Sequence, residues 1–325
     1  MVVYLSGLAR RTPPRPCRVF WRELVTDSMS RISRAGSQPP FYHPPAFAEE
    51  LAFARQLAAQ ASAVALERCR HLSPREKANR SFVTDLDLDV ERLLRDRLAA
   101  RFPEDALTGE EHDREGGDGP RRWSIDPIDG TGNLVHGLPL WAISIGLLVE
   151  SPSGDGESAA ESESSPPHPV VGVIAIPPLG ETFWAVQGGG AWLDDQPLPP
   201  LAEWDAESFH PQDNVSLSTN ALRRLDPRRV PGRIRDLGAA CVELAFLAAG
   251  RLRAAVFLGE AEHDLAAGAV LLGEVGASIR RLDAEGTRLT PARLVAETPV
   301  RIPTLLGPRG RVDALFERLD PYATT

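Results

Sequence analysis

Residues 123–133 read Trp-Ser-Ile-Asp-Pro-Ile-Asp-Gly-Thr-Gly-Asn and form the most informative segment of the chain. A short apolar run, which predicts a strand, ends in Asp126; Pro127 fixes the backbone, and Asp129 follows two residues later. Two carboxylates on such a turn can converge on one point, and Mg²⁺ prefers oxygen ligands at about 2.0–2.1 Å. Gly130-Thr131 then offers backbone N–H groups and a hydroxyl to a phosphate. The alternative is a polar Asx turn, in which Asp, Pro and Gly are common.

Three other acidic segments are candidates for the same site, and each has a simpler interpretation. Glu110-Glu111 is an adjacent acid pair just upstream, although such pairs are usually solvated loop charges. Thr84 and Asp87 have the spacing of a capping box at a helix start. Asp264, which follows His263, has the position of a helix N-cap.

Composition and charge exclude two classes of function. The chain has 325 residues, of which 42% are hydrophobic and 25% are charged, as in ordinary globular proteins. No apolar run approaches the roughly 20 residues that span a bilayer. A net charge of −9 argues against a nucleic-acid partner, because phosphate backbones require a basic surface. Cys17, Cys69 and Cys241 form neither a metal-binding pair nor a disulfide framework, so we expect a reducing, cytoplasmic environment.

Residues 1–45 differ in composition from the rest of the chain. They carry seven arginines against Glu23 and Asp27, together with seven prolines, and show no sustained periodicity. We expect a basic, disordered N-terminal extension. An organelle-targeting segment is the alternative, and Met29 is an alternative start.

The remainder predicts two halves, residues 46–198 and 199–325, in which helices alternate with strands. Apolar periodicity predicts helices from about Ala46, after Thr84 as far as Phe102, over Ala239–Gly250 and over Leu265–Val275. The expected strands are Trp123–Ile125, Trp141–Val149, Val170–Ile176, Thr182–Val186, Val215–Ser218 and Ala254–Leu258. Residues 151–168, rich in Ser, Glu, Gly and Pro, predict a mobile hairpin insertion. The fold class is therefore α/β or α+β with mixed sheets.

Taken together, these motifs resemble the signature of the inositol monophosphatase family, which includes enzymes similar to fructose-1,6-bisphosphatase. The resemblance covers roughly residues 46–310 and is carried by the following segments: Glu110-Glu111, Asp126-Pro-Ile-Asp-Gly-Thr131, Asn133-Leu-Val-His-Gly-Leu-Pro139, Ser144-Ile-Gly146, Gly172–Pro177, Gly188-Gly-Gly-Ala191, Arg235–Gly250, Asp264-Leu-Ala-Ala-Gly268 and Glu274-Val-Gly276. It implies a layered αβαβα sandwich, with most metal ligands in the first half and the active site completed by the second.

The resemblance also implies roles for individual residues. The residues that match the family's metal ligands are Glu111, Asp126, Asp129, Asp264 and the carbonyl of Ile128. Thr131 and Glu111 match the pair that activates the attacking water, and Asp87 matches the acid that supports the threonine. The implied phosphate and substrate contacts are Ile128, Asp129, Gly130, Thr131, Gly238, Ala239, Ala240 and Asp264.

Two positions depart from the family pattern. His263 stands where the family commonly has Trp; it either packs differently at the helix start, or contacts substrate and tunes the leaving-group side. Phe257 stands where inositol-preferring members carry a glutamate that binds substrate hydroxyls, and Glu260 or Glu262 are the candidates to replace it. These departures weaken inositol 1-phosphate as substrate more than they weaken phosphatase chemistry.

The expected function is hydrolysis of a small phosphate monoester by water activated on two or three Mg²⁺ ions, in a protein that is a homodimer as many members are. Within the enzyme class, the alternatives to an inositol monophosphate are histidinol phosphate, fructose 1,6-bisphosphate and 3′-phosphoadenosine 5′-phosphate. From another class, the alternative is a non-catalytic regulator that binds metal or phosphometabolites. We expect neither a nucleic-acid partner nor a membrane.

Overall fold

The computed structural model describes residues 45–70, 72–77, 82–150, 166–204 and 208–319. The predicted basic extension lies outside these residues except for Pro45, and so does most of the predicted hairpin insertion. None of the described helices is both long and apolar enough to span a membrane.

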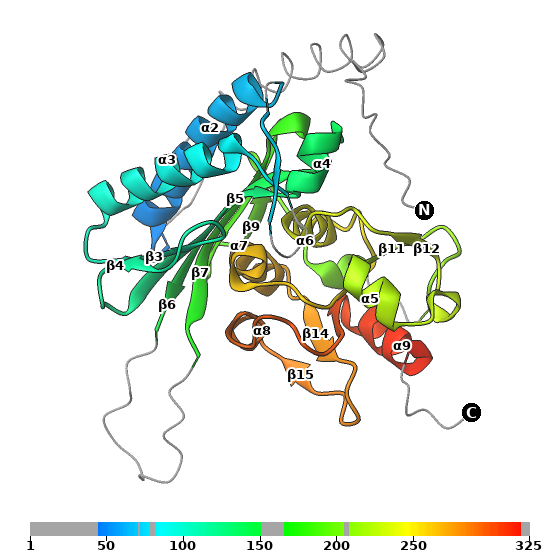
Figure 1. The fold of residues 1–325 in the computed structure, drawn as a ribbon. Coiled ribbons are helices and arrows are strands. Elements are labelled where there is room, and N and C mark those ends of the chain that lie inside the picture. Colours follow the sequence, from blue (N-terminus) through cyan, green and yellow to red (C-terminus); the bar gives the residue numbers. More distant parts are fainter. Residues whose placement is uncertain (1–44, 71, 78–81, 151–165, 205–207, 320–325) are drawn as a thin grey trace, which may run out of the picture.

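Two mixed sheets and three helical layers alternate (Figure 1). The helices are α2 (Ala48–Arg68), α3 (Asp85–Arg101), α4 (Thr131–His136), α5 (Thr219–Arg224), α6 (Ala240–Ala248), α7 (Glu262–Glu274), α8 (Pro291–Ala296) and α9 (Arg309–Leu319), with 3₁₀ turns at Pro177–Leu179, Leu201–Trp204 and Pro227–Arg229.

The larger sheet has eight strands in the order β10-β9-β8-β7-β6-β5-β3-β4, antiparallel except for the parallel pair β3 and β5. Its strands are β3 (Ala106–Gly109), β4 (Glu115–Gly116), β5 (Arg121–Asp129), β6 (Ala142–Val149), β7 (His168–Ile176), β8 (Glu181–Val186), β9 (Ala191–Leu193) and β10 (Gln196–Pro197). A separate hairpin pairs β1 (Arg75–Glu76) with β2 (Phe82–Val83).

The smaller sheet has six strands in the order β12-β11-β13-β16-β14-β15. Its strands are β11 (Asn214–Leu217), β12 (Arg233–Arg235), β13 (Ala254–Phe257), β14 (Ser278–Arg281), β15 (Arg288–Leu289) and β16 (Thr304–Gly307). The strands β12, β11 and β13 are parallel, and the remaining pairs are antiparallel.

Alternation of apolar side chains along the strands builds the layers. On β5, Trp123 and Ile125 pack against α2 and α3. On the smaller sheet, Phe257 packs toward α6 and α7, whereas Val256 packs toward α5 and α9 on the opposite face. The order of layers is α2/α3, large sheet, α6/α7, small sheet, α5/α9, which confirms the predicted αβαβα sandwich.

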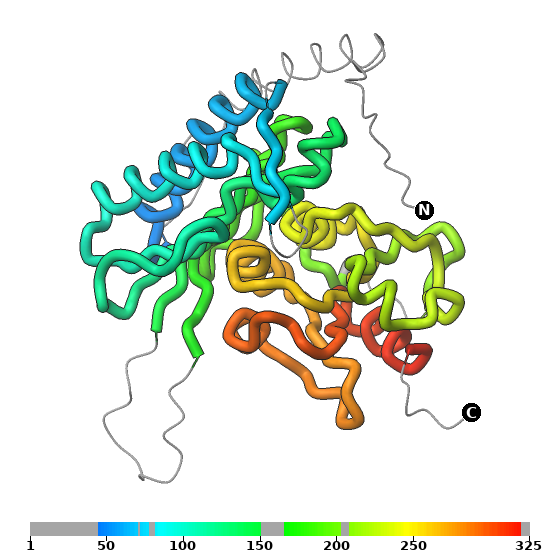
Figure 2. The backbone as a smooth tube through the Cα atoms, in the orientation of Figure 1, coloured from blue at the N-terminus to red at the C-terminus, as the bar shows by residue number. Residues whose placement is uncertain are grey.

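The helix α7 lies directly on the larger sheet (Figure 2). A Cβ added at Gly146 would lie 2.8 Å from Ala266 Cβ, and one added at Gly172 would lie 2.2 Å from Ala267 O. These two strand positions must therefore be glycine for the helix to approach the sheet this closely.

The predicted helices and strands are confirmed with small shifts at their ends, and two details differ. The strand β5 continues through Asp126 to Asp129, with a register shift against β6 between the two aspartates. Asp264 is not the N-cap of α7, because Ala261 holds that position. The Asp264 side chain instead accepts a 2.6 Å hydrogen bond from Ala261 N, as a residue in the first turn of a helix can.

Candidate active site

Asp126 and Asp129 lie at the end of β5 and are 1% and 6% exposed. Asp126 Oδ1 accepts a 3.0 Å hydrogen bond from Ile128 N, which holds the irregular strand end in shape. The two Asp129 oxygens accept hydrogen bonds from Ala240 N at 3.1 Å and Cys241 N at 2.8 Å, in the first turn of α6. Asp129 therefore links the larger sheet to the N-terminus of α6, where a negative charge is stabilised.

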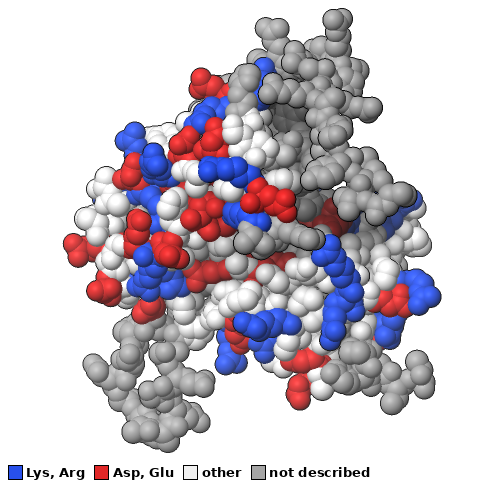
Figure 3. All heavy atoms as spheres, viewed as in Figure 1, with Lys and Arg blue, Asp and Glu red and all other residues white. Residues whose placement is uncertain are grey.

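The acids of this site repel one another. Burial raises the pKa of Asp126 well above its usual value, and Glu110, Asp129 and Asp264 raise it further. Burial and then Asp264 raise the pKa of Asp129 in the same way. In the space-filling view, acidic side chains gather across the middle of this face, between α3 and α7 (Figure 3). Buried carboxylates that repel one another form a binding site for cations, because cations relieve both the repulsion and the cost of burial.

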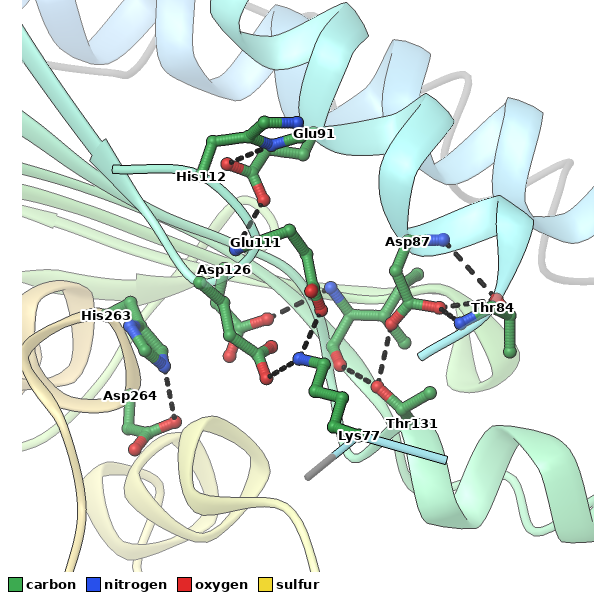
Figure 4. Close-up of polar contacts among 12 residues, drawn as sticks. Lys77, Thr84, Asp87, Glu91, Glu111, His112, Asp126, Thr131, His263 and Asp264 are labelled. Carbon is green, nitrogen blue, oxygen red and sulfur yellow. Dashed lines mark hydrogen bonds and ion pairs between the residues drawn. The ribbon is translucent and has the colours of Figure 1, made fainter. Parts of the chain in front are cut away.

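Thr131 begins α4 and contacts Asp87 of α3 (Figure 4). Its hydroxyl lies 2.7 Å from Asp87 Oδ1 and 3.0 Å from the carbonyl oxygen of Ile128. The backbone N–H and hydroxyl of Thr84 also donate to Asp87, so the predicted capping box is confirmed. Burial raises the pKa of Asp87, while the hydrogen bonds from Thr84 and Thr131 oppose that shift.

The adjacent glutamates both contact Lys77, and Figure 4 shows the contact with Glu111. Lys77 Nζ donates to Glu111 Oε1 at 2.6 Å and to Glu110 Oε1 at 2.9 Å. Burial opposes the charge of Lys77, but its hydrogen bonds with Glu111 and Glu110 raise its pKa. Burial raises the pKa of Glu111. The Glu111 backbone is fixed because its N–H donates to Glu91 Oε2 at 2.9 Å.

The helix α7 brings the fourth acidic segment to the site. Asp264 and its neighbour His263 lie in the first turn of this helix. The ligand atoms of Glu110, Asp126 and His263 all lie within 4.8 Å of one another. Those of Asp126, Asp129 and Cys241 do so as well. Burial raises the pKa of the Cys241 thiol well above its usual value, and its Sγ donates to the Asp264 carbonyl at 3.2 Å, so Cys241 links α6 to α7.

The predicted phosphate and substrate contacts also come together. Gly130 has a left-handed backbone with φ of 85°. A Cβ there would lie 2.9 Å from Ala239 Cβ and 3.3 Å from Gly238 O. Asn133 fixes this junction because its side-chain amide donates to the carbonyl of Leu237 at 2.7 Å. The Gly130-Thr131 turn and the start of α6 are therefore side by side.

The two departures from the family pattern differ in their placement. Phe257, the last residue of β13, is fully buried in the core between this strand and the helices α6 and α7, where no polar substrate can contact it. Of the candidate replacements, Glu262 is held by Arg122 at 2.6 Å. Glu260 is 8% exposed, and burial raises its pKa to about 7. His263, in contrast, lies among the carboxylates.

Sequence reasoning missed two features of this site. Glu110, which was not assigned as a ligand, has a carboxylate oxygen in one cluster with Asp126. Lys77 is the only lysine of the chain and belongs to none of the motifs, so no pattern pointed to it.

The fold is a layered α/β architecture, and its clusters of acidic side chains could hold a metal ion. The oxygen donors fit a hard cation, and the lysine ammonium between two of them shows that they can hold positive charge. The model of the inositol monophosphatase family matches residues 48–309, so the chain belongs to that family of phosphoric monoester hydrolases, as the motifs implied.

Several relatives agree with this membership. The chain is 32% identical over 233 residues to a histidinol-phosphatase of Chlorobaculum parvum, covering 70% of this chain and 83% of the relative. It is 35% identical over 216 residues to an inositol-1-monophosphatase of Bacillus subtilis, covering 62% and 73%. Among solved structures, the extragenic suppressor protein suhB of Bartonella henselae has a TM-score of 0.68 at 23% identity, covering 84% of this chain and 99% of the other. This last likeness shows the fold.

Proposed function

We propose that this chain hydrolyses a small-molecule phosphate monoester with two or three Mg²⁺ ions. The observation that carries the proposal is the convergence of carboxylates from four separate segments: Asp126 and Asp129 of β5, Asp264 of α7, Glu110 and Glu111 after β3, and Asp87 of α3. Bound Mg²⁺ supplies charge for the phosphate oxygens and lowers the pKa of water.

We assign the metal-binding role to Asp126, Asp129, Asp264, the Ile128 carbonyl and the Glu110-Glu111 pair. Glu110 is placed in this set because its carboxylate lies with that of Asp126. Glu111 has a second role as the acceptor of a proton from the attacking water, because its carboxylate lies in the site and its backbone is fixed by Glu91.

Thr131 positions the water. A hydroxyl has one proton, and in the shorter of its two contacts Thr131 donates that proton to Asp87 at 2.7 Å. The lone pairs of its oxygen then remain to accept a hydrogen bond from water, which leaves the water oxygen directed at phosphorus. Asp87, buried and bound by Thr84, keeps this hydroxyl in one orientation.

The phosphate and the alcohol contact the junction between the two halves. We place the phosphate against Gly130 and Thr131, beside Gly238, Ala239 and Ala240, because an extra Cβ at Gly130 would contact that turn. The structure gives less information on the alcohol part of the phosphate monoester. Phe257 is buried, so the hydroxyl-binding glutamate of inositol-preferring relatives has no equivalent at that position.

The test is turnover of p-nitrophenyl phosphate with and without Mg²⁺, followed by a panel of inositol monophosphate, histidinol phosphate, fructose 1,6-bisphosphate and 3′-phosphoadenosine 5′-phosphate. Histidinol phosphate is the second candidate, because a 32% identical relative is named a histidinol-phosphatase. We expect magnesium-dependent turnover. Phosphometabolite binding without any turnover would instead favour a regulator.

A further inference from the structure

His263 lies where two metal-binding carboxylates meet, although an imidazole is not needed to bind Mg²⁺. One ligand atom from each of Glu110, Asp126 and His263 falls within 4.8 Å of the other two. Two ligands of one ion at about 2.0–2.2 Å each are at most about 4.4 Å apart, so a small side-chain adjustment brings all three onto one ion.

The three residues come from three different elements. Glu110 follows β3, Asp126 ends β5, and His263 is in the first turn of α7, which is seated on the sheet by Gly146 and Gly172. The packing of α7 against the sheet at Gly146 and Gly172 therefore sets the distance between the His263 imidazole and the two carboxylates.

The His263 ring is also available to a ligand. Its Nε2 lies 3.7 Å from Asp264 Oδ1, which is longer than a hydrogen bond, and its side chain is 20% exposed. Glu110, its neighbour, already binds a cationic group in the form of Lys77 Nζ at 2.9 Å. The cluster thus combines an imidazole with carboxylates that attract a cation.

We propose that His263 is a metal ligand that adds a nitrogen to the Glu110–Asp126 position and shifts its preference from Mg²⁺ toward a transition metal such as Mn²⁺, Co²⁺ or Zn²⁺. Imidazole suits these metals, whereas Mg²⁺ prefers carboxylate, carbonyl and water. The inference rests on the proposed function, because Asp126 is shared with the catalytic metal set.

The experiment titrates the metal-free full chain with Co²⁺, followed by visible absorption, and measures Zn²⁺ and Mg²⁺ affinity by calorimetry. The variants are His263→Trp, which restores the common family residue, and His263→Gln. The matched control is His112→Gln, since His112 is near the site but pairs with Glu91 at 3.2 Å. Circular dichroism of the metal-free variants checks that they fold.

We expect Co²⁺ and Zn²⁺ affinity to fall by about 10- to 100-fold in both His263 variants, and Mg²⁺ affinity to change much less. The control should bind all three ions as the parent does. In a ¹⁵N NMR spectrum, the chemical shifts of the His263 ring nitrogens should change when Zn²⁺ is added.

Unchanged Co²⁺ and Zn²⁺ affinity in both folded His263 variants, or ring nitrogens that do not respond to Zn²⁺, would overturn the inference. Failure of the proposed function has a different signature: the parent chain binds Co²⁺ through His263 but hydrolyses no phosphomonoester with any metal. If one His263 variant fails to fold, the other variant and the ¹⁵N spectrum of the parent chain give the answer.

Discussion

The hydroxyl of Thr131 lies 2.7 Å from Asp87 Oδ1, although 44 residues separate the two along the chain. Asp87 is anchored in turn by the backbone and hydroxyl of Thr84. The Asp87 carboxylate thus belongs both to a helix cap and to the contact with Thr131, the residue proposed to position the water. Substitution of Asp87 is therefore expected to change both stability and turnover.

Asp87→Asn is expected to lower kcat by about 10²- to 10⁴-fold, the range for loss of positioned proton transfer, with a smaller effect on KM. Thr131 and Thr84 donate to different oxygens of Asp87, so an amide can accept from one of them but not from both. It also weakens the cap of α3, at a cost of about 1 kcal/mol. Steady-state kinetics and urea unfolding measure the two effects. The control is Asp89→Asn on the same helix, where Asp89 binds Arg68 at the surface; equal losses of turnover in both variants would contradict the role.

Asp129→Asn is expected to abolish metal-dependent turnover and leave the fold intact. The Asn side-chain oxygen can still accept a hydrogen bond from Ala240 or Cys241, but it no longer supplies the charge that a divalent ion requires. Calorimetric Mg²⁺ titration and a phosphatase assay check this, and near-normal turnover would remove Asp129 from the metal set.

Lys77→Met is expected to raise the affinity for Mg²⁺. The ammonium lies between Glu110 and Glu111, and a cation there competes with a divalent ion for the same oxygens. Magnesium titrations of Lys77→Met, Lys77→Arg and the parent chain measure the effect. We expect tighter binding in the methionine variant alone, since arginine keeps the charge. Weaker binding in Lys77→Met would mean that Lys77 supports the ion instead.

Gly130→Ala is expected to destabilise the chain and reduce activity. Its φ is 85°, and a Cβ there would lie 2.9 Å from Ala239 Cβ and 3.1 Å from the Leu140 carbonyl oxygen. The strain should cost at least about 1 kcal/mol. Gly132 is the matched control, because an added Cβ there meets nothing within 4 Å, and alanine should be tolerated. Urea unfolding measures the stability of both variants. Equal stabilities of Gly130→Ala and Gly132→Ala would contradict the explanation by strain at Gly130.

Glu243 is expected to make the metal-free chain less stable as the pH rises from 4.5 to about 8. Burial raises its pKa from 4.5 to about 8, so the folded chain keeps a proton that the unfolded chain releases. The stabilisation is complete below pH 4.5 and is lost as the pH rises to about 8, with a slope of about 1.4 kcal/mol per pH unit.

Glu243→Gln should flatten this dependence, because the amide has no proton to lose and can still accept the Leu237 N–H. Urea unfolding midpoints between pH 5 and 8 in the presence of a chelator measure it. The control is Glu181→Gln, which removes a surface partner of Arg251 and should keep the parent slope. An unaltered slope in Glu243→Gln would assign the dependence to other groups.

The α/β or α+β class with mixed sheets and the Asp126–Asp129 pair could be predicted because they depend on short-range patterns, whereas the layered αβαβα arrangement came from the family resemblance. Alternating apolar residues mark the strands, helical periodicity marks α2, α3 and α7, and the Thr84–Asp87 spacing marks a cap. The resemblance to a family then joined segments that lie far apart in sequence.

The remaining features depend on the path of loops and on tertiary packing. Whether Glu110 or Glu111 points to Asp126 depends on the backbone after β3, where neighbouring side chains diverge and no periodicity applies. Lys77 reaches the site from a hairpin edge far from the other motifs. The burial of Phe257 follows from which face of β13 meets α6 and α7, and this is set by the partner layers rather than by the strand itself.

Gly146 and Gly172, which let α7 pack closely on the larger sheet, also have a consequence for the order in which the site forms during folding. Asp264 reaches the acids of β5 only after the chain has completed α7 and set it on β6 and β7 at Gly146 and Gly172. A nascent chain that ends at β10 has Asp126 and Asp129 but not Asp264, and it lacks the α6 amides that donate hydrogen bonds to Asp129. The proposed metal site is therefore complete only after α6 and α7 have packed against the larger sheet.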